Sequence, residues 1–149
     1  MKIKITDTRD KDFLAMCGEL NSHLNSAVSG REKIYNTMES LDNIFYVALA
    51  VEKGVIAGMA ALAKIDNDTA EIRTVFVKPL YRGKGIAKEL CKHLETVAKK
   101  KGFKTMILDT WEQLSNAVKL YEKLGYTRYD GEIINEIDKW CVYMRKELV

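Results

Sequence analysis

The sequence predicts a single α+β or α/β domain over residues 1–149, with the element order β-α-α-β-β-β-α-β-α-β-β. Three observations support this prediction. The chain has 149 residues, a length that suits one domain with its own core. Three strand-like segments joined by short turns occupy residues 43–79, and a strongly periodic helical segment follows them. No repeat, low-complexity tract or linker interrupts the pattern.

The N-terminal third predicts one strand and two helices. The segment KIKIT (2–6) alternates polar and apolar residues, as a strand does. Asp10 is placed to cap a helix that runs to about Ser22. Residues 21–30, NSHLNSAVSG, are polar and predict a loop, and a shorter helix follows over about 31–40. The apolar face of the first predicted helix consists of Phe13, Leu14, Cys17 and Leu20.

The middle of the chain predicts an antiparallel meander. Its turns are expected at Lys53-Gly54 and at residues 66–68, Asp-Asn-Asp. Pro79 is expected to end the third strand, because proline cannot donate to a ladder. From Gly85 to about Lys101 the apolar period becomes helical, with lysines on the opposite face. The apolar face comprises Ile86, Ala87, Leu90, Cys91, Leu94, Val97 and Ala98.

The C-terminal part predicts a buried strand over 104–110, a helix over 116–124 and two last strands around 126–131 and 140–147. Gly102 and Gly125 stand where helices commonly end.

Composition narrows the function class. No apolar run approaches the roughly 18 residues that span a bilayer, and the N-terminus lacks a signal-peptide pattern, so no membrane is expected. Three widely spaced cysteines without metal-ligand spacing predict buried thiols, no metal site and a cytoplasmic location. The net charge of +3 does not indicate nucleic-acid binding.

The charge is unevenly distributed. Between Lys78 and Lys104 nine lysines and arginines stand against two glutamates, an excess of +7. This cluster suits a compact polyanion. A solvated, lysine-rich helix face is the alternative interpretation.

The segment YRGKGIAKEL (81–90) places two glycines before the long helix. It lacks the hydroxyl residue that follows Gly-Lys in a P-loop, because Ile86 comes after Gly85. It also lacks the third glycine of the dinucleotide fingerprint, where Lys88 stands instead. Glycines before a helix let backbone N–H groups converge on an anion, which the helix dipole also favours.

The hexapeptide Arg82-Gly83-Lys84-Gly85-Ile86-Ala87 matches the pattern Arg/Gln-x-x-Gly-x-Gly/Ala. In this segment, and in AEIRTVFVKPLYRGKGIAKELCKHLE, MILDT and NAVKLYEKLGY, the chain resembles the GNAT superfamily of N-acetyltransferases. The resemblance implies a mixed, mostly antiparallel sheet of six or seven strands flanked by about four helices. It also implies that this hexapeptide binds the pyrophosphate of acetyl-CoA.

The same resemblance assigns roles to other residues. The backbones of Phe76 and Val77 would bind the pantetheine arm, with an amide near Val75 or Val77 polarising the thioester carbonyl. Asn116, at the start of a helix, would contact the arm or a bridging water, although an N-cap role explains it equally well. Lys119 is a further candidate phosphate contact.

Two candidate catalytic residues follow from the resemblance. Tyr121 lies where the family places the general acid for the departing thiolate; the alternative is a core tyrosine. Glu71 would act as the base for the acceptor ammonium, through water. Because strand alternation places Glu71 and Arg73 on one face, an ion pair is the competing interpretation.

Other reactive side chains have weaker cases. Tyr81 and Tyr126 are not expected to act as acids. His93 is expected to be exposed on its helix. His23 lies in the predicted loop, which the resemblance places beside the acceptor site, and is a further titratable candidate. Cys91 falls on the apolar face of its helix, so no acyl-enzyme is expected.

The function that the resemblance implies is acetyl transfer from acetyl-CoA to a primary amine of a small molecule, by direct attack on the thioester. A protein N-terminal or lysine acetyltransferase and a non-catalytic CoA-binding module are the alternatives. The acceptor pocket is expected between the first two helices, the start of the fourth strand and the final hairpin around DGEIINEIDKWCVYM. The acids of that hairpin could favour a cationic amine or simply be solvated. Trp111 and Trp140 could wall the pocket or, as is more common, pack in the core. Similar proteins often dimerise, and the sequence leaves a homodimer open.

Overall fold

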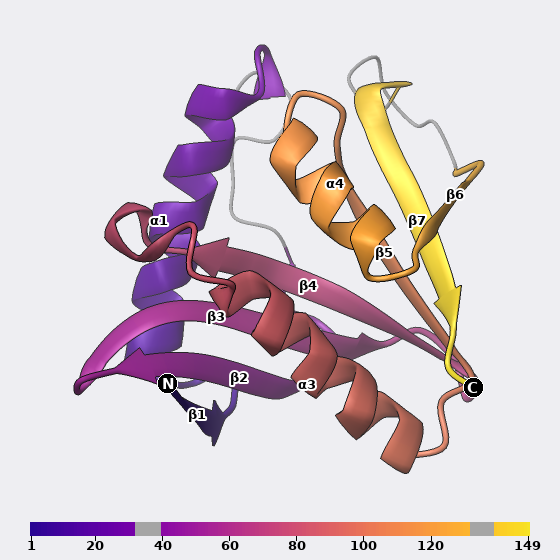
Figure 1. The fold of residues 1–149 in the computed structure, drawn as a ribbon, viewed down its shortest axis with the longest axis horizontal. Helices are drawn as coiled ribbons and strands as arrows, with labels where there is room; N and C mark the ends of the chain where they lie inside the picture. Colours follow the sequence, from indigo (N-terminus) through magenta and orange to yellow (C-terminus); the bar gives the residue numbers. More distant parts are fainter. Residues whose placement is uncertain (32–39, 132–138) are drawn as a thin grey trace.

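The computed structural model describes residues 1–31, 40–131 and 139–149. Within these ranges, seven strands form one sheet in the order β1-β2-β3-β4-β5-β7-β6, in which β4 and β5 are parallel (Figure 1). The remaining neighbours are antiparallel. The predicted fold class is confirmed. In chain order the elements are β1 (Lys2–Thr6), α1 (Lys11–Ala27), β2 (Ile44–Glu52), β3 (Val55–Lys64), β4 (Thr69–Val77), the 3₁₀ turn η1 (Pro79–Tyr81), α3 (Ile86–Lys100), β5 (Thr105–Trp111), α4 (Ser115–Lys123), β6 (Thr127–Tyr129) and β7 (Cys141–Glu147).

Two apolar clusters lie on opposite faces of the sheet. Phe13, Met16 and Cys17 of α1 pack on Val47, Leu49, Met59, Ala61 and Phe76. The helices α3 and α4 pack on the other face, against alternate residues of the same strands such as Ala48 and Leu62. Successive side chains of β2 and β3 point to opposite faces of the sheet, and both faces are covered by helices. These strands are therefore apolar at nearly every position.

The meander follows its predicted turns. Lys53 and Gly54 both have positive φ, +48° and +80°, which is the backbone of the tight hairpin turn that matches strand twist. β4 ends at Val77, just before Pro79. α3, α4 and the last two strands also lie where the sequence predicts them, within a few residues at their ends.

The first helix is longer than predicted. Asp10 caps it as expected, because its carboxylate accepts hydrogen bonds from the N–H groups of Asp12 and Phe13. The helix then continues to Ala27, so the loop prediction for residues 21–27 was wrong. Leu24 continues the apolar stripe from Leu20 and packs near Trp111, a tertiary contact that outweighs the polar composition. Most of the helix predicted over 31–40 lies outside the described residues.

β4 and β5 diverge after a short parallel stretch. They pair only from Thr69 to Glu71, opposite Thr105 to Ile107, and then separate (Figure 1). β4 also carries a bulge there: Met59 faces Phe76 and Ala61 faces Arg73, so one residue of β3 opposes two of β4. Thr74, inside the bulge, has a φ of +54°. The divergence opens the sheet at its centre.

Candidate active site

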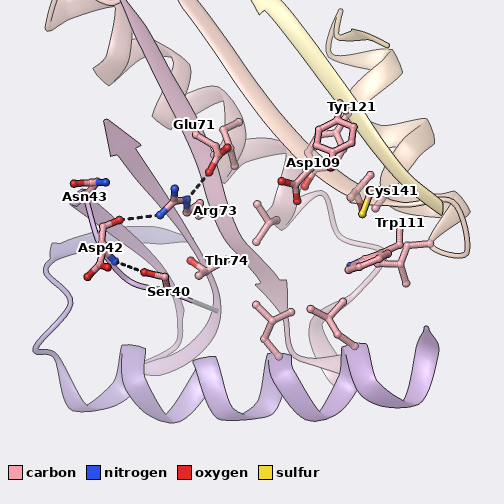
Figure 2. Close-up of a pocket in the computed structure, with 18 residues that line it drawn as sticks. Ser40, Asp42, Asn43, Glu71, Arg73, Thr74, Asp109, Trp111, Tyr121 and Cys141 are labelled. Carbon is pink, nitrogen blue, oxygen red and sulfur yellow. Dashed lines mark hydrogen bonds and ion pairs between the residues drawn. The ribbon is translucent and has the colours of Figure 1, made fainter. Parts of the chain in front are cut away.

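A cleft of about 720 Å³ lies where β4 and β5 diverge. The helices α1 and α4, the strands β4, β5 and β7 and the segment before β2 contribute its walls (Figure 2). Its polar side chains include Asp42, Glu71, Arg73, Thr74, Asp109, Tyr121 and Tyr143. Polar groups from distant parts of the chain therefore converge on one concave site.

The glycine loop lies beyond the end of β4. Gly83 and Gly85 both have a φ of +79°, a conformation that glycine adopts without strain, and the space around each is open. Gly85 is the N-cap of α3 and has no side chain to accept the first N–H groups of the helix. The start of this 15-residue helix therefore presents unsatisfied donors and the positive end of its dipole to an open space.

Two basic side chains flank this loop. The Nε of Arg82 donates to the carbonyl of Val77 at 2.9 Å, and its guanidinium lies 5.5 Å from the centre of the Phe76 ring. The ammonium of Lys84 lies 5.4 Å from the Tyr81 ring. Arg82 thus links the loop to the end of β4.

The loop also depends on a residue that the sequence analysis did not single out. Gly58 of β3 lies so close to its neighbours that an added Cβ would stand 3.1 Å from the Phe76 carbonyl and 3.2 Å from side-chain methyls of Ile86 and Val77. Ile86, whose placement in the loop motif was predicted, is buried in this contact. Ala87 follows it in the first turn and is half-buried. A glycine inside an apolar strand is the signal that could have indicated this close approach.

Tyr121 projects from α4 and lines the cleft with its side chain 5% exposed (Figure 2). Its ring meets Tyr126 edge-on, with ring centres 6.0 Å apart. Burial, with smaller contributions from Cys91 and Asp109, raises its pKa well above the ordinary value of 10, so the phenol is protonated at neutral pH. The tyrosine is both a core residue and a cleft residue.

Tyr126 and Cys91, which lie near Tyr121, are not placed to take part in chemistry in the cleft. The hydroxyl of Tyr126 donates to the Glu95 carboxylate at 2.8 Å, and Lys146 reaches the other oxygen of Glu95 at 3.0 Å. Burial raises the pKa of Cys91 to about 12. A thiol of this kind is not a nucleophile at neutral pH, in agreement with its placement in the apolar face of α3.

Glu71 and Arg73 form the ion pair that alternation along β4 predicts. The Nε of Arg73 donates to the Glu71 carboxylate, and its Nη1 donates to the backbone carbonyl of Asp42 at 2.8 Å (Figure 2). Their side chains are 17% and 22% exposed, so the pair sits in the wall of the cleft rather than on the open surface.

Two other predicted contact residues lie on the exposed side of α4. Asn116 and Lys119 are solvent-exposed and do not line the cleft. The N-cap interpretation of Asn116 was wrong, because α4 begins at Ser115 with Leu114 as its cap residue.

The histidines differ from expectation. His23 lies on α1 rather than in a loop, with its ring 6.0 Å from that of Phe76. Its pKa is lowered by burial and then by the charge of Arg82. His93 is half-buried instead of exposed and shares a hydrogen bond of 2.7 Å with the Tyr46 hydroxyl, because its side of α3 faces β2.

The structure describes only part of the segment in which the sequence predicts the acceptor pocket. Residues 132–138, which include the acids Glu132, Glu136 and Asp138, lie outside the described residues. Trp111 lines the cleft and is 8% exposed, whereas Trp140 is 41% exposed and is not a core residue. Thr74 and Asp109 are cleft residues that the sequence analysis did not find, because only the bulge and the strand divergence bring them there.

The donor set at the α3 N-terminus fits the phosphates of a coenzyme A molecule. Open glycine backbone, unsatisfied helix N–H groups and two cations suit a pyrophosphate. The strand β4 joins the two places, because Glu71 to Val75 line the cleft and the strand ends at Val77, shortly before this loop. Among the residues that the structure describes, no group of three His, Cys, Asp or Glu is placed to hold a metal ion. None of the helices within the described ranges is long and apolar enough to cross a membrane.

Comparisons with known proteins agree with this geometry. The family model described as "Acetyltransferase (GNAT) family" matches residues 14–126. An uncharacterised N-acetyltransferase of Bacillus subtilis is 28% identical over 99% of this chain and 100% of its own length. Another, of Escherichia coli, is 37% identical over 49% of this chain and 44% of its own length, so the chain matches less than half of that relative.

Solved structures share the fold. A Klebsiella pneumoniae protein assigned as an acyl-CoA N-acyltransferase superposes with a TM-score of 0.80 at 21% identity, over 99% of this chain and 97% of that one. A GNAT family acetyltransferase from Elizabethkingia anophelis, with acetyl-CoA bound, superposes with a TM-score of 0.69 at 20% identity, over 98% and 97% of the two chains.

Proposed function

Because this chain belongs to the acetyltransferase (GNAT) family, we propose that it transfers an acetyl group from acetyl-CoA to a primary amine of a small molecule. The observation that carries this proposal is the alignment of three features along β4. The open glycine loop follows its end, the divergence from β5 lies beside its middle, and Tyr121 faces the cleft there. The cleft volume of about 720 Å³ is typical of small-molecule sites.

The donor would bind along this path. The N–H groups at the start of α3, with Arg82, Gly83, Lys84 and Gly85, would hold the pyrophosphate. The backbone of Phe76 and Val77, which β5 does not pair, would hold the pantetheine arm through β-strand-like hydrogen bonds. Asn116 and Lys119 remain candidates for outer contacts.

Acetyl-CoA supplies an activated thioester, so an amine held next to it can attack directly. Holding the two substrates together contributes much of the acceleration. Tyr121 would donate its hydroxyl proton toward the departing sulfur. Burial raises the pKa of the Tyr121 phenol well above 10, so the hydroxyl keeps its proton until a base forms beside it. Because burial disfavours a bare thiolate, a proton donated by Tyr121 to the departing sulfur would avoid leaving that charge in the cleft.

Glu71 would accept the proton that the acceptor ammonium must lose, through a water molecule. Its ion pair with Arg73 orients the carboxylate in the cleft wall. The structural and the catalytic interpretations of Glu71 are thus compatible. The buried thiols of Cys17 and Cys91 suit a reducing compartment, and we place the reaction in the cytoplasm.

A thermal-shift titration tests the donor assignment, with acetyl-CoA, CoA, ATP and NAD compared side by side. At a concentration one hundred times Kd, a ligand stabilises the native state by about 2.7 kcal/mol. For a chain of this size we expect Tm to rise by about 5–11 °C with acetyl-CoA or CoA. An equal effect of ATP or NAD, with no advantage for CoA, would contradict the assignment. Release of the CoA thiol with a panel of amines then tests the transfer itself, and release with folded protein substrates alone would favour a protein acetyltransferase.

A further inference from the structure

Thr74 carries two unfavourable features at once. Its side chain is 7% exposed, and its hydroxyl oxygen has no hydrogen-bond partner among the residues that the structure describes. Its φ of +54° is unusual for a β-branched residue. A buried unsatisfied hydroxyl and a left-handed threonine each reduce stability. Valine would remove the first cost and glycine the second, so no contact within the described ranges favours a threonine here.

The bulge decides where this hydroxyl lies. Ala70 and Ile72 face the α3 side of the sheet, which leaves Glu71 and Arg73 on the α1 side. Strict alternation would return Thr74 to the α3 side. Instead it lines a small hollow together with Cys17, Leu20 and Leu24 of α1, and it also lines the main cleft. Arg73 and Thr74, adjacent in sequence, therefore project from the same face of β4 (Figure 2).

Arg73 adds further donors to this part of the cleft. Its contacts with Glu71 and with the Asp42 carbonyl use two of the five N–H donors of the guanidinium. These two contacts hold the planar group in place. A guanidinium and a hydroxyl from adjacent residues that line one cleft are both donors of the kind that the oxygens of a carboxylate accept from.

We propose that the Thr74 hydroxyl and the Arg73 guanidinium bind a carboxylate of the acceptor, which is therefore an amine of the amino-acid type. This inference rests on the proposed function. The charges of the cleft suit a zwitterion: the donor pair lies on one side of the strand divergence, and the Asp109 carboxylate lies on the other, near Tyr121 (Figure 2). The ammonium of such an acceptor would face Asp109 and Glu71 while its carboxylate meets Thr74.

The test compares the common L-amino acids with their amides as acceptors, using thiol release at saturating acetyl-CoA. We expect the wild-type protein to have a higher kcat/KM for acids than for the corresponding amides. Thr74→Val keeps the shape and removes the hydroxyl. It should lower kcat/KM about 10- to 100-fold for the acid and much less for the amide, with KM for acetyl-CoA unchanged. Thr74→Ser should restore most of the loss.

Stability provides an independent readout. Because Thr74→Val removes a buried hydroxyl without a partner, its Tm should equal or exceed that of the wild type, so loss of activity would not reflect misfolding. Thr105→Val, at a threonine of β5 outside the cleft whose hydroxyl contacts Glu147, is the matched control and should keep the preference for acids.

The outcomes separate this inference from the proposed function. If acetyl-CoA binds but no amino acid is acetylated, or if Thr74→Val affects acids and amides alike, the acceptor inference is wrong and the donor assignment stands. If acetyl-CoA does not bind at all, the proposed function itself fails.

Discussion

Replacing Gly58 by alanine tests whether the close contact between β3 and the start of α3 sets the geometry of the glycine loop. The added methyl would stand 3.1 Å from the Phe76 carbonyl oxygen and 3.2 Å from methyls of Ile86 and Val77. The carbonyl belongs to a paired strand and cannot rotate away, so β4 or α3 has to move. The same atom thus perturbs the strand end that would bind pantetheine and the helix that would bind pyrophosphate.

The expected magnitude follows from two opposing effects. Overpacking of this kind costs about 1–3 kcal/mol. Replacing glycine also lowers the conformational entropy of the unfolded chain, which stabilises the folded state by about 0.5–1 kcal/mol. Gly18→Ala isolates the second effect, because Gly18 lies inside α1 and a Cβ there meets nothing within 4 Å. The difference in Tm between the two variants should then be about 2–12 °C, with Gly58→Ala the less stable.

The assay combines thermal unfolding with acetyl-CoA titration of both variants. Gly58→Ala should weaken acetyl-CoA binding roughly fivefold, the effect of losing one hydrogen bond of about 1 kcal/mol. Gly18→Ala should bind like the wild type. Equal stability and equal affinity in the two variants would refute the idea that this contact positions the loop.

Three further changes probe the site and the fold. Tyr121→Phe should lower kcat about 10²- to 10⁴-fold while changing KM for acetyl-CoA less than about threefold, and an unchanged kcat would remove the acid role. Gly85→Ala should lower stability in urea unfolding by about 1–2 kcal/mol although its surroundings are open, because its φ is +79°; unchanged stability would refute the left-handed cap. Asp10→Ala should cost about 1 kcal/mol at pH 7. Hydrogen bonds, the largest from the Phe13 N–H, lower the pKa of Asp10 below 3.8, so this stabilisation is present above that value and is lost as pH falls through the folded-state pKa. The difference in unfolding free energy between the wild type and Asp10→Ala, measured in urea, should therefore shrink between pH 5 and pH 2. A difference that stays constant would contradict the cap.

Local signals predicted most elements. Alternation over KIKIT, the Lys53-Gly54 turn and the apolar stripe of α3 are each encoded within a few residues, and each element lies where expected. The prediction failed where a distant contact overrides local polarity. Residues 21–27 are polar on average, yet Leu24 packs near Trp111 and keeps them helical. His93 likewise contacts Tyr46, 47 residues away, so its half-burial was not visible on its own helix.

By itself the sequence indicated the family and predicted the glycine loop at the start of α3, because six consecutive residues encode both glycine conformations, the helix start and the flanking charges. It also indicated the Glu71–Arg73 pair, which depends only on the period of a strand. The tertiary structure decided what faces the cleft. Strand divergence depends on where pairing stops, and the bulge that turns Thr74 toward α1 depends on register with β3. The approach of Gly58 to Ile86 joins residues 28 positions apart. Register and close packing are through-space properties, so they arise only when the whole sheet has formed.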